Sequence, residues 1–202
     1  MLVGICGGSC SGKTALVKEL QAKLLDKIAV VSFDDYFLGA DKLDYEKVTD
    51  WESPNLYDYE KFIDDLSRLK QGQEIRFESH SRESDDEGIK EKTVPPKALT
   101  IVEGFLIYYH PVARSFFDKR IFIELPEDEI LKRRIARRKG NKHWDNSQYL
   151  KTKFLESQRK FVFPQKKYAD LVMDGNEPVG VLVEKIEQEL GRIKELDFLL
   201  DL

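Results

Sequence analysis

The sequence predicts an α/β protein in which a parallel sheet is covered by helices on both faces. Short segments that are apolar throughout alternate with amphipathic segments of helical period, and apolar strands separated by helices are typical of a parallel sheet. A glycine-rich stretch, GICGGSCSGKT at residues 4–14, joins the first apolar segment to the first helical one. The length of 202 residues and the 41% content of hydrophobic residues indicate a single globular domain, residues 1–202.

The strand candidates are short apolar runs, most of them rich in β-branched residues. They lie at Leu2–Cys6, Ile28–Phe33, Leu99–Gly104, Arg120–Leu125 and Ala169–Gly175. The first helix follows the glycine-rich stretch, because leucine and valine side chains recur there at helical spacing up to residue 24. The other helical stretches lie at Tyr59–Lys70, Val112–Phe117, Asp128–Arg138, Gln148–Lys160 and Val181–Leu199.

Residues 74–94 depart from this alternation. Two segments of strand-like composition, EIRFESHSR and IKEKTV, flank the acidic sequence ESDDEG, whose DDEG is typical of a turn. The pattern predicts a β-hairpin inserted in the α/β framework, as an added lobe and not as a second domain. A basic segment at about 130–147 is the second addition, and we interpret it as a lid.

The charge balance and the cysteine content narrow the class of protein. Lysine and arginine number 33 against 37 acidic residues, for a net charge of −4, which argues against nucleic acid or an anionic membrane as the partner. No stretch is apolar enough to span a membrane, and MLVGICGG lacks the pattern of a secretory signal. The two cysteines, Cys6 and Cys10, make no disulfide framework. We therefore expect a reduced, cytoplasmic protein, whose oligomeric state stays open, a homo-oligomer included.

The glycine-rich stretch matches the phosphate-binding pattern G-x-x-x-x-G-K-[ST], with the strand before it and the helix after it that this pattern requires. Its residues are Gly7, Gly8, Ser9, Cys10, Ser11, Gly12, Lys13 and Thr14. Glycines let backbone N–H groups surround a polyphosphate at a helix N-terminus. We expect Lys13 to reach the β- and γ-phosphates of a nucleoside triphosphate and Thr14 to bind Mg²⁺. The alternative, an ordinary glycine-rich turn, does not need the lysine, the threonine and both neighbouring elements together. The fold class expected is therefore a P-loop NTPase-type parallel sheet, with the hairpin and the basic lid as additions.

The class of reaction follows by comparison with other nucleotide-binding proteins. A GTPase is expected to carry N-K-x-D, but in NKHWD at residues 141–145 the aspartate comes one residue too late. A motor or helicase domain is expected to be longer. Phosphate transfer to a small molecule remains, and it needs a base for the acceptor hydroxyl and arginines for the transferred group.

Candidates for these roles are present. VSFDDYF puts Asp34 and Asp35 at the carboxyl end of the second strand, where α/β proteins bind ligands; the alternative is a pair that caps a helix. Residues 130–143 hold seven lysines and arginines and no acid, which fits a lid over an anionic ligand, although a solvated helix face is the usual reason. Glu103 ends the strand TIVE, in a position to hold the water shell of the metal; the alternative is an ordinary carboxylate at a strand end.

Taken in order, these motifs resemble those of the uridine kinase/phosphoribulokinase family of P-loop kinases, a group that includes nicotinamide riboside kinases. The similar segments are GGSCSGKT, SFDDYF, DWESPNLYD, ESHSR, VEGFLIY, ELPEDEILKRRIARR and FPQKKYADLVM. The resemblance covers nearly the whole chain, and it implies Asp34 as the catalytic base and Glu52 as the acid that binds the ribose hydroxyls. The other site residues that it implies are Phe77, His80 and Arg134 for the substrate and Arg137 for catalysis.

The departures from the family pattern fall at the expected substrate site. Glu52 stands where the family usually has aspartate, Ser53 replaces the histidine after it, and Ile75 replaces a tyrosine. The segment after Arg137 is shorter than a uridine kinase lid and lacks its R-G-R-D element. We expect phosphorylation of the 5′-hydroxyl of uridine or cytidine, with a nicotinamide riboside kinase or another small-alcohol kinase as alternatives. A non-catalytic, regulatory nucleotide-binding protein is the alternative from another class.

Overall fold

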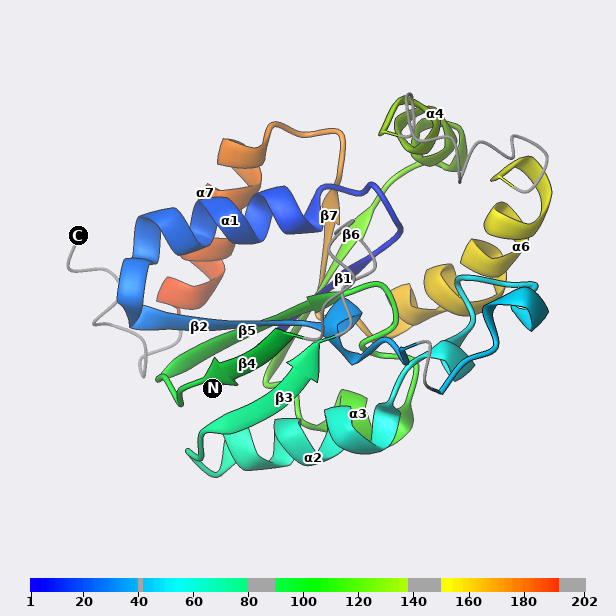
Figure 1. Cartoon of the computed structure of the whole chain (residues 1–202). Helices are drawn as coiled ribbons and strands as arrows, with labels where there is room; N and C mark the ends of the chain where they lie inside the picture. The colour runs from blue at the N-terminus through cyan, green and yellow to red at the C-terminus, as the bar shows by residue number, and fades with distance from the viewer. Residues whose placement is uncertain (40–41, 80–89, 138–149, 193–202) are drawn as a thin grey trace.

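The computed structural model describes residues 1–39, 42–79, 90–137 and 150–192, and a five-stranded parallel sheet lies at its centre (Figure 1). The strand order across the sheet is β2-β5-β1-β6-β7. The strands are β1 (Leu2–Gly7), β2 (Ile28–Ser32), β5 (Leu99–Gly104), β6 (Lys119–Glu124) and β7 (Leu171–Asp174). Each confirms a predicted strand, and the parallel pairing puts all the carboxyl ends at one edge of the sheet.

Helices cover both faces of this sheet, as the sequence predicts (Figure 1). On one face lie α1 (Lys13–Leu24) and α7 (Val179–Gly191), and on the other lie α2 (Tyr59–Lys70) and α3 (Pro111–Ser115). Side chains that alternate along β6 explain this division. Ile121 and Ile123 are buried with residues of α1 and α7, whereas Phe122 is buried in an aromatic-rich cluster on the other face. Each face of the sheet therefore has its own hydrophobic core.

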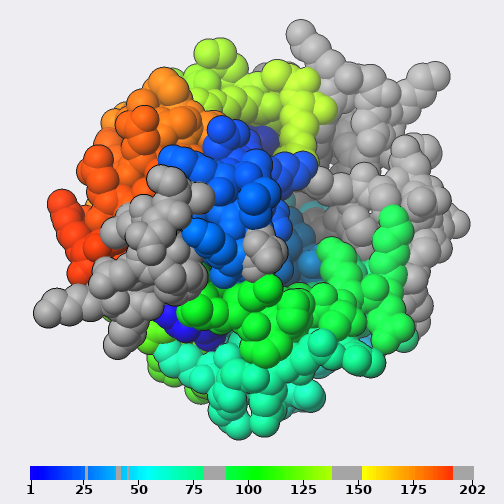
Figure 2. Space-filling model, turned by 90° about the vertical axis from the view of Figure 1, so that its left-hand side faces the viewer, coloured from blue at the N-terminus to red at the C-terminus, as the bar shows by residue number. Residues whose placement is uncertain are grey.

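The predicted hairpin is confirmed by β3 (Ile75–Ser79) and β4 (Lys90–Val94), which pair antiparallel. Its predicted tip, DDEG, lies outside the described residues. Phe77 of β3 is buried, and its ring stacks on the ring of Tyr36 with 5.0 Å between centroids. The space-filling view in Figure 2 shows the hairpin and α2 as one continuous surface with the N-terminal segment above them. The assignment of residues 1–202 to a single domain stays a prediction.

The largest departure from the expected elements lies at residues 150–162, where the sequence predicts a regular helix. The segment forms π-helical turns at Leu150–Phe154 and Gln158–Val162 on either side of α6 (Leu155–Ser157), and a 3₁₀ turn, Phe163–Tyr168, follows. Turns of this wider kind are uncommon and are frequently found at functional sites. Phe154, Gln158 and Val162, at intervals of four residues, are all fully buried. Burial of this row shows which side of the segment faces the interior.

The remaining helices agree with the sequence to within a few residues. The helix predicted at 128–138 is α4 (Glu127–Arg137). The lid expected at about 130–147 begins within α4, and its part beyond residue 137 lies outside the described residues. The last helix, α7, begins two residues before its predicted start, and the predicted continuation to Leu199 falls outside the described residues as well. Over the ranges that the structure describes, we find no helix with the length and apolarity needed to cross a bilayer.

Candidate active site

The glycine-rich loop runs from the end of β1 to the first residue of α1, as its pattern predicts. Gly12 precedes the helix in a left-handed conformation with φ of 97°, which a residue with a Cβ rarely adopts. At Gly8 a Cβ would lie only 3.0 Å from Ile130 Cδ1 and 3.1 Å from Gln158 Oε1. Glycine therefore permits both the shape of this loop and the close approach of the two elements that cover it.

Lys13 is held under the loop. Its ammonium group donates hydrogen bonds to the carbonyl oxygens of Gly7, at 3.0 Å, and Gly8, at 2.9 Å, and the side chain is 8% exposed. The hydroxyl of Ser11 is also buried, and it makes no hydrogen bond within the described part of the chain. A buried cation and a buried hydroxyl with unused hydrogen-bonding capacity fit an anionic ligand at this loop.

Glu103 and Asp34 lie on neighbouring strand ends. Ser32, the last residue of β2, is opposite Glu103 in the sheet and donates a hydrogen bond to its Oε1 at 3.1 Å. Gly104 lets the 3₁₀ turn Phe33–Tyr36 approach β5, because a Cβ at this position would lie 2.4 Å from Phe33 Cβ. The turn thus brings Asp34 to the carboxyl edge of the sheet.

Electrostatics links these side chains to the phosphate loop. Burial raises the pKa of Glu103, the nearby Lys13 ammonium acts in the opposite direction, and Asp34 raises the pKa further. The neighbouring parallel strands β1, β5 and β2 bring the phosphate loop with Lys13, Glu103 and the turn with Asp34 to the same edge of the sheet. This group combines a cation for phosphates with two carboxylates, the combination that phosphate transfer to an alcohol requires.

The structure distinguishes the two adjacent aspartates. Asp35 accepts hydrogen bonds from Ser79 Oγ of β3, at 2.7 Å, and from Lys92 Nζ of β4, at 2.6 Å. It therefore fastens the hairpin to the body of the protein. The side chain of Asp35 is 12% exposed, whereas Asp34 is an exposed residue at the edge of the sheet. Of the two, Asp34 is the one whose position suits contact with a substrate.

Arg134 of α4 connects the phosphate loop to Glu52. Its Nη1 donates a hydrogen bond to Ser9 Oγ at 2.7 Å, and its Nη2 forms an ion pair with Glu52 Oε1 at 3.5 Å. Glu52 is only 3% exposed, so the arginine supplies the counter-charge that a buried carboxylate needs. The Nε of Arg134 is buried and has no hydrogen-bond partner in the described residues. The expected ribose-binding acid and the expected lid arginine are therefore in contact.

Gln158 makes a second connection between the phosphate loop and Glu52, and no sequence motif assigns a role to it. Its Oε1 accepts a hydrogen bond from the backbone N–H of Ser9 at 3.4 Å, and its Nε2 donates to Glu52 Oε2 at 3.3 Å. The signal in the sequence is a glutamine in the middle of an apolar row with four-residue spacing, between Phe154 and Val162. That signal marks a buried polar residue but does not identify its partners.

The remaining expected site residues are Phe77, Arg137 and His80, of which the last lies outside the described residues. Phe77 is 6% exposed and belongs to the aromatic-rich core. Arg137 is an exposed residue at the end of α4, and His80 lies outside the described residues. Arg133 faces away from Glu52, because its guanidinium donates to Glu129 Oε1 and to the carbonyl oxygen of Gly175. The roles expected for Phe77, His80 and Arg137 stay predictions.

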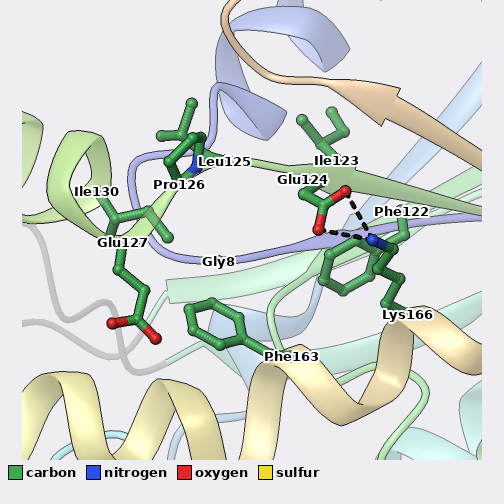
Figure 3. A pocket seen from close by; sticks show the side chains of 10 residues that line it. All are labelled: Gly8, Phe122, Ile123, Glu124, Leu125, Pro126, Glu127, Ile130, Phe163 and Lys166. Carbon is green, nitrogen blue, oxygen red and sulfur yellow. Dashed lines mark hydrogen bonds and ion pairs between the residues drawn. The ribbon is translucent and has the colours of Figure 1, made fainter.

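A pocket of about 220 Å³ lies beside the phosphate loop (Figure 3). Gly8 forms one wall, the start of α4 forms another, and the ring of Phe163 points into the space between them. Lys166 and Glu124 form an ion pair at its far end, with Nζ 2.6 Å from Oε1. Phe122 and Ile130 make much of the lining apolar. The pocket leaves space beside the loop, between α4 and the segment that carries Gln158.

The oxygen ligands of the site suit Mg²⁺. Among the described residues there is no group of three or more His, Cys, Asp and Glu side chains that could enclose a metal ion. Mg²⁺ is usually held by one or two carboxylates together with substrate phosphates and water, so a complete protein cage is not required. Glu103 offers a buried carboxylate, and Thr14 offers an exposed hydroxyl at the start of α1. These two residues fit the ion.

Comparison with known proteins agrees with the sequence motifs. The model of the phosphoribulokinase/uridine kinase family matches residues 2–179. A uridine kinase of Borrelia duttonii is 32% identical over 182 residues, which cover 85% of each chain. A uridine kinase of Chlamydia pneumoniae is 27% identical over 98% of this chain and 93% of its own length. The uridine kinase-like protein 3 of Arabidopsis thaliana is 28% identical over 95% of this chain, which spans only 43% of that longer relative.

Solved structures with the same fold include several kinases. A putative fructose transport system kinase of a Silicibacter species has a TM-score of 0.69 at 23% identity, over 86% of this chain and 89% of its own. Phosphoribulokinase of Rhodobacter spheroides has a TM-score of 0.66 at 11% identity, over 88% and 73% of the two chains. Identities this low concern the fold alone. The structural similarity, with TM-scores of 0.69 and 0.66, confirms the expected α/β fold of the P-loop NTPase type.

Proposed function

Because the chain belongs to the phosphoribulokinase/uridine kinase family, we propose that it is a Mg·ATP-dependent kinase that phosphorylates the 5′-hydroxyl of a nucleoside, with uridine and cytidine as acceptors. The observation that carries this proposal is that the phosphate loop with Lys13, the strand end with Glu103 and the turn with Asp34 share the carboxyl edge of the sheet. One cation and two carboxylates at this place supply a phosphate grip, a base and a metal ligand.

The phosphate loop and Lys13 hold the triphosphate. The backbone N–H groups of the loop and the N-terminus of α1 attract the phosphate oxygens. Lys13 exchanges its hydrogen bonds with the carbonyl oxygens of Gly7 and Gly8 for contacts with the β- and γ-phosphates. Thr14 and Glu103 would hold Mg²⁺, which would neutralise phosphate charge. The raised pKa of Glu103 reflects a buried carboxylate that gains from a nearby cation.

Asp34 and Glu52 act on the acceptor. Asp34 accepts the proton of the 5′-hydroxyl as that oxygen attacks the γ-phosphate. Glu52 accepts hydrogen bonds from the 2′- and 3′-hydroxyls of the ribose. Within the described part of the chain, its two oxygens make one long contact each, at 3.5 Å to Arg134 and 3.3 Å to Gln158, so both can accept further hydrogen bonds. Arg134, together with Arg137, stabilises the transferred group, because Arg134 already reaches Ser9 of the phosphate loop.

The adjacent aspartates give a matched pair of variants that tests the base. Asp34→Asn is expected to lower kcat by about 10²–10⁴, the usual range for a positioned base, with the affinity for ATP changed by less than about threefold. Asp35→Asn removes the negative charge that pairs with Lys92 of the hairpin and is expected to lower the melting temperature more than kcat. ATP consumption is measured with uridine, cytidine, nicotinamide riboside and ribulose 5-phosphate. If Asp34→Asn keeps the wild-type kcat, the proposed base is wrong.

The ribose of the acceptor is tested through Glu52. Removal of one hydroxyl leaves the carboxylate with one hydrogen bond fewer, a loss of about 1–3 kcal/mol. Uridine is therefore expected to exceed 2′-deoxyuridine about ten- to a hundredfold in kcat/KM. Glu52→Ala should remove most of this preference, whereas the wild-type ratio should persist in Asp35→Asn. Equal kcat/KM values for the two acceptors in the wild type would show that Glu52 does not hold the diol.

A further inference from the structure

We propose that Gln158 is a positioning residue, which holds the acceptor-binding carboxylate of Glu52 at a fixed place relative to the phosphate loop. This inference rests on the proposed function and names a residue that acts through Glu52. Gln158 does not itself touch the acceptor or the nucleotide. It connects the carboxylate that holds the ribose to the loop that holds the triphosphate, so that the 5′-hydroxyl and the γ-phosphate are aligned.

Both ends of the Gln158 amide are engaged. The oxygen accepts the N–H of Ser9 at 3.4 Å, and the nitrogen donates to Glu52 Oε2 at 3.3 Å. The side chain has no exposed surface. A primary amide has an acceptor and donors a fixed distance apart, so a residue bonded at both ends sets the separation of its two partners.

The burial of Gln158 is itself informative. Its neighbours in the row, Phe154 and Val162, are apolar and fully buried, and an apolar side chain at position 158 would continue that row. Burial of an amide stabilises the fold only when its polar atoms are hydrogen-bonded. The two contacts are long, so they compensate only part of the desolvation of the amide. We therefore attribute the presence of glutamine to the alignment of Glu52 and not to stability.

Arg134 makes a parallel connection between Ser9 and Glu52, but it has a different task. Its guanidinium carries the charge that the transferred phosphate requires, and its contact with Glu52 is an ion pair at 3.5 Å. A nucleotide at Ser9 would compete for this guanidinium. Gln158 is neutral, and its segment is anchored by the buried neighbours on either side. Of the two connections, the one through Gln158 is therefore the one that keeps Glu52 in place during the reaction.

The expected effect lies in kcat. Misplacement of reacting groups by about 1 Å lowers a rate by about a hundredfold, whereas each substrate still makes its own contacts. Replacement of Gln158 by Met keeps the length and approximate volume but removes both hydrogen bonds. We expect Gln158→Met to lower kcat with uridine about ten- to a hundredfold, and to leave the KM values for ATP and uridine within about threefold.

Gln165 provides a matched control. It is also a buried glutamine, 2% exposed, and it donates to the carbonyl oxygens of Phe105 and Phe161 at 2.8 Å each. It contacts neither Ser9 nor Glu52 through these bonds. Gln165→Met is therefore expected to lower the melting temperature and to keep kcat within about threefold of the wild type, when both are assayed below their melting temperatures. A loss of kcat in Gln165→Met as large as in Gln158→Met would overturn the inference.

A double-mutant cycle tests whether Gln158 acts through Glu52. In the Glu52→Ala background, Gln158→Met should lower kcat by less than about threefold, because the carboxylate that it positions is gone. If Gln158→Met does not fold, Gln158→Asn replaces it, since the shorter amide cannot reach both partners. An unchanged kcat in these variants, with an active wild type, overturns the inference alone. A wild type that phosphorylates no nucleoside overturns the proposed function, and the role of Gln158 with it.

Discussion

The hydroxyl of Tyr108 offers a test of how the sheet behind the site is held together. It donates a hydrogen bond to the carbonyl oxygen of Gly4 in β1 at 2.6 Å and accepts one from the N–H of Ile121 in β6 at 3.0 Å. Burial raises the pKa of Tyr108 well above its ordinary value of 10, so the hydroxyl stays protonated and keeps donating. The ring lies against the backbone, because a Cβ at Gly4 would be 2.7 Å from Tyr108 Cε1.

Tyr108→Phe removes the hydroxyl and keeps the ring. Two buried backbone groups then lose a partner, at about 1–3 kcal/mol each, so the free energy of unfolding should fall by about 2–6 kcal/mol. For a protein of this length, that loss corresponds to a decrease of about 5–20 °C in melting temperature. Residual kinase activity per folded molecule should stay within about threefold, because Gly4 and Ile121 lie before the strand ends that carry the site.

Tyr59→Phe is the control for this experiment. The hydroxyl of Tyr59 has a single acceptor, the carbonyl oxygen of Leu106 at 3.0 Å, and the residue is only half-buried. Its loss should lower the free energy of unfolding by about 0.5–1.5 kcal/mol. Urea unfolding followed by circular dichroism measures both variants. Equal losses in Tyr108→Phe and Tyr59→Phe, or a Tyr108→Phe variant as stable as the wild type, would refute the reasoning.

Three further predictions concern charge and reactivity. Lys13→Met should abolish phosphate transfer and the thermal stabilisation by Mg·ATP. Lys18→Met, on the exposed side of α1, should keep both. Turnover in Lys13→Met would exclude the proposed role of Lys13 in binding the phosphates. Iodoacetamide should modify Cys10 more slowly when Mg·ATP is present. It should leave Cys6 unmodified, because burial raises the pKa of that thiol to about 12. Mass spectrometry of the peptides measures the modification of both cysteines. Burial also raises the pKa of Asp65 in the folded protein. Ionisation of Asp65 therefore lowers the free energy of unfolding at a pH above its folded-state pKa, and this cost is absent at a pH below its unfolded-state pKa. From about pH 7 to about pH 4, the wild type should therefore gain stability relative to Asp65→Asn in urea unfolding, and a relative loss would contradict this assignment.

The elements of the central sheet could be predicted because their physical cause is local. A strand buried on both faces is apolar along its whole length, and this pattern is visible in β1 and β5 without knowledge of their neighbours. The phosphate loop is local for the same reason, since its glycines and Lys13 act within one turn of backbone. The wide turns at residues 150–162 were not predictable in this way, because they depend on how buried side chains such as Phe154 pack against distant parts of the chain.

The acceptor half of the site was predictable only through the resemblance to a family. Asp34 and Asp35 are equivalent in a single sequence, and Lys92 of the hairpin, which distinguishes them, is 57 residues from Asp35. Gln158 lies 149 residues from Ser9 and 106 from Glu52, so no pattern along the chain reports these hydrogen bonds. The sequence indicates which residue types are present for chemistry, and the packing of the segments decides which of them meet.

The two halves of the site are held by different forces, and this difference bears on how the acceptor is selected. The half that binds the phosphates, which comprises the phosphate loop and Glu103, is positioned by backbone pairing between strands. Ser32 lies opposite Glu103, and Cys6 lies opposite Gly104. Side-chain contacts of 3.3–3.5 Å connect Glu52 to the rest of the site, and hydrogen bonds of that length are weak. The place of the phosphate loop therefore depends on the sheet, whereas the place of Glu52 depends on the side chains of Gln158 and Arg134. Substitution of Glu52 itself should consequently change which alcohol is phosphorylated, whereas substitution of Gln158 should lower the rate of transfer.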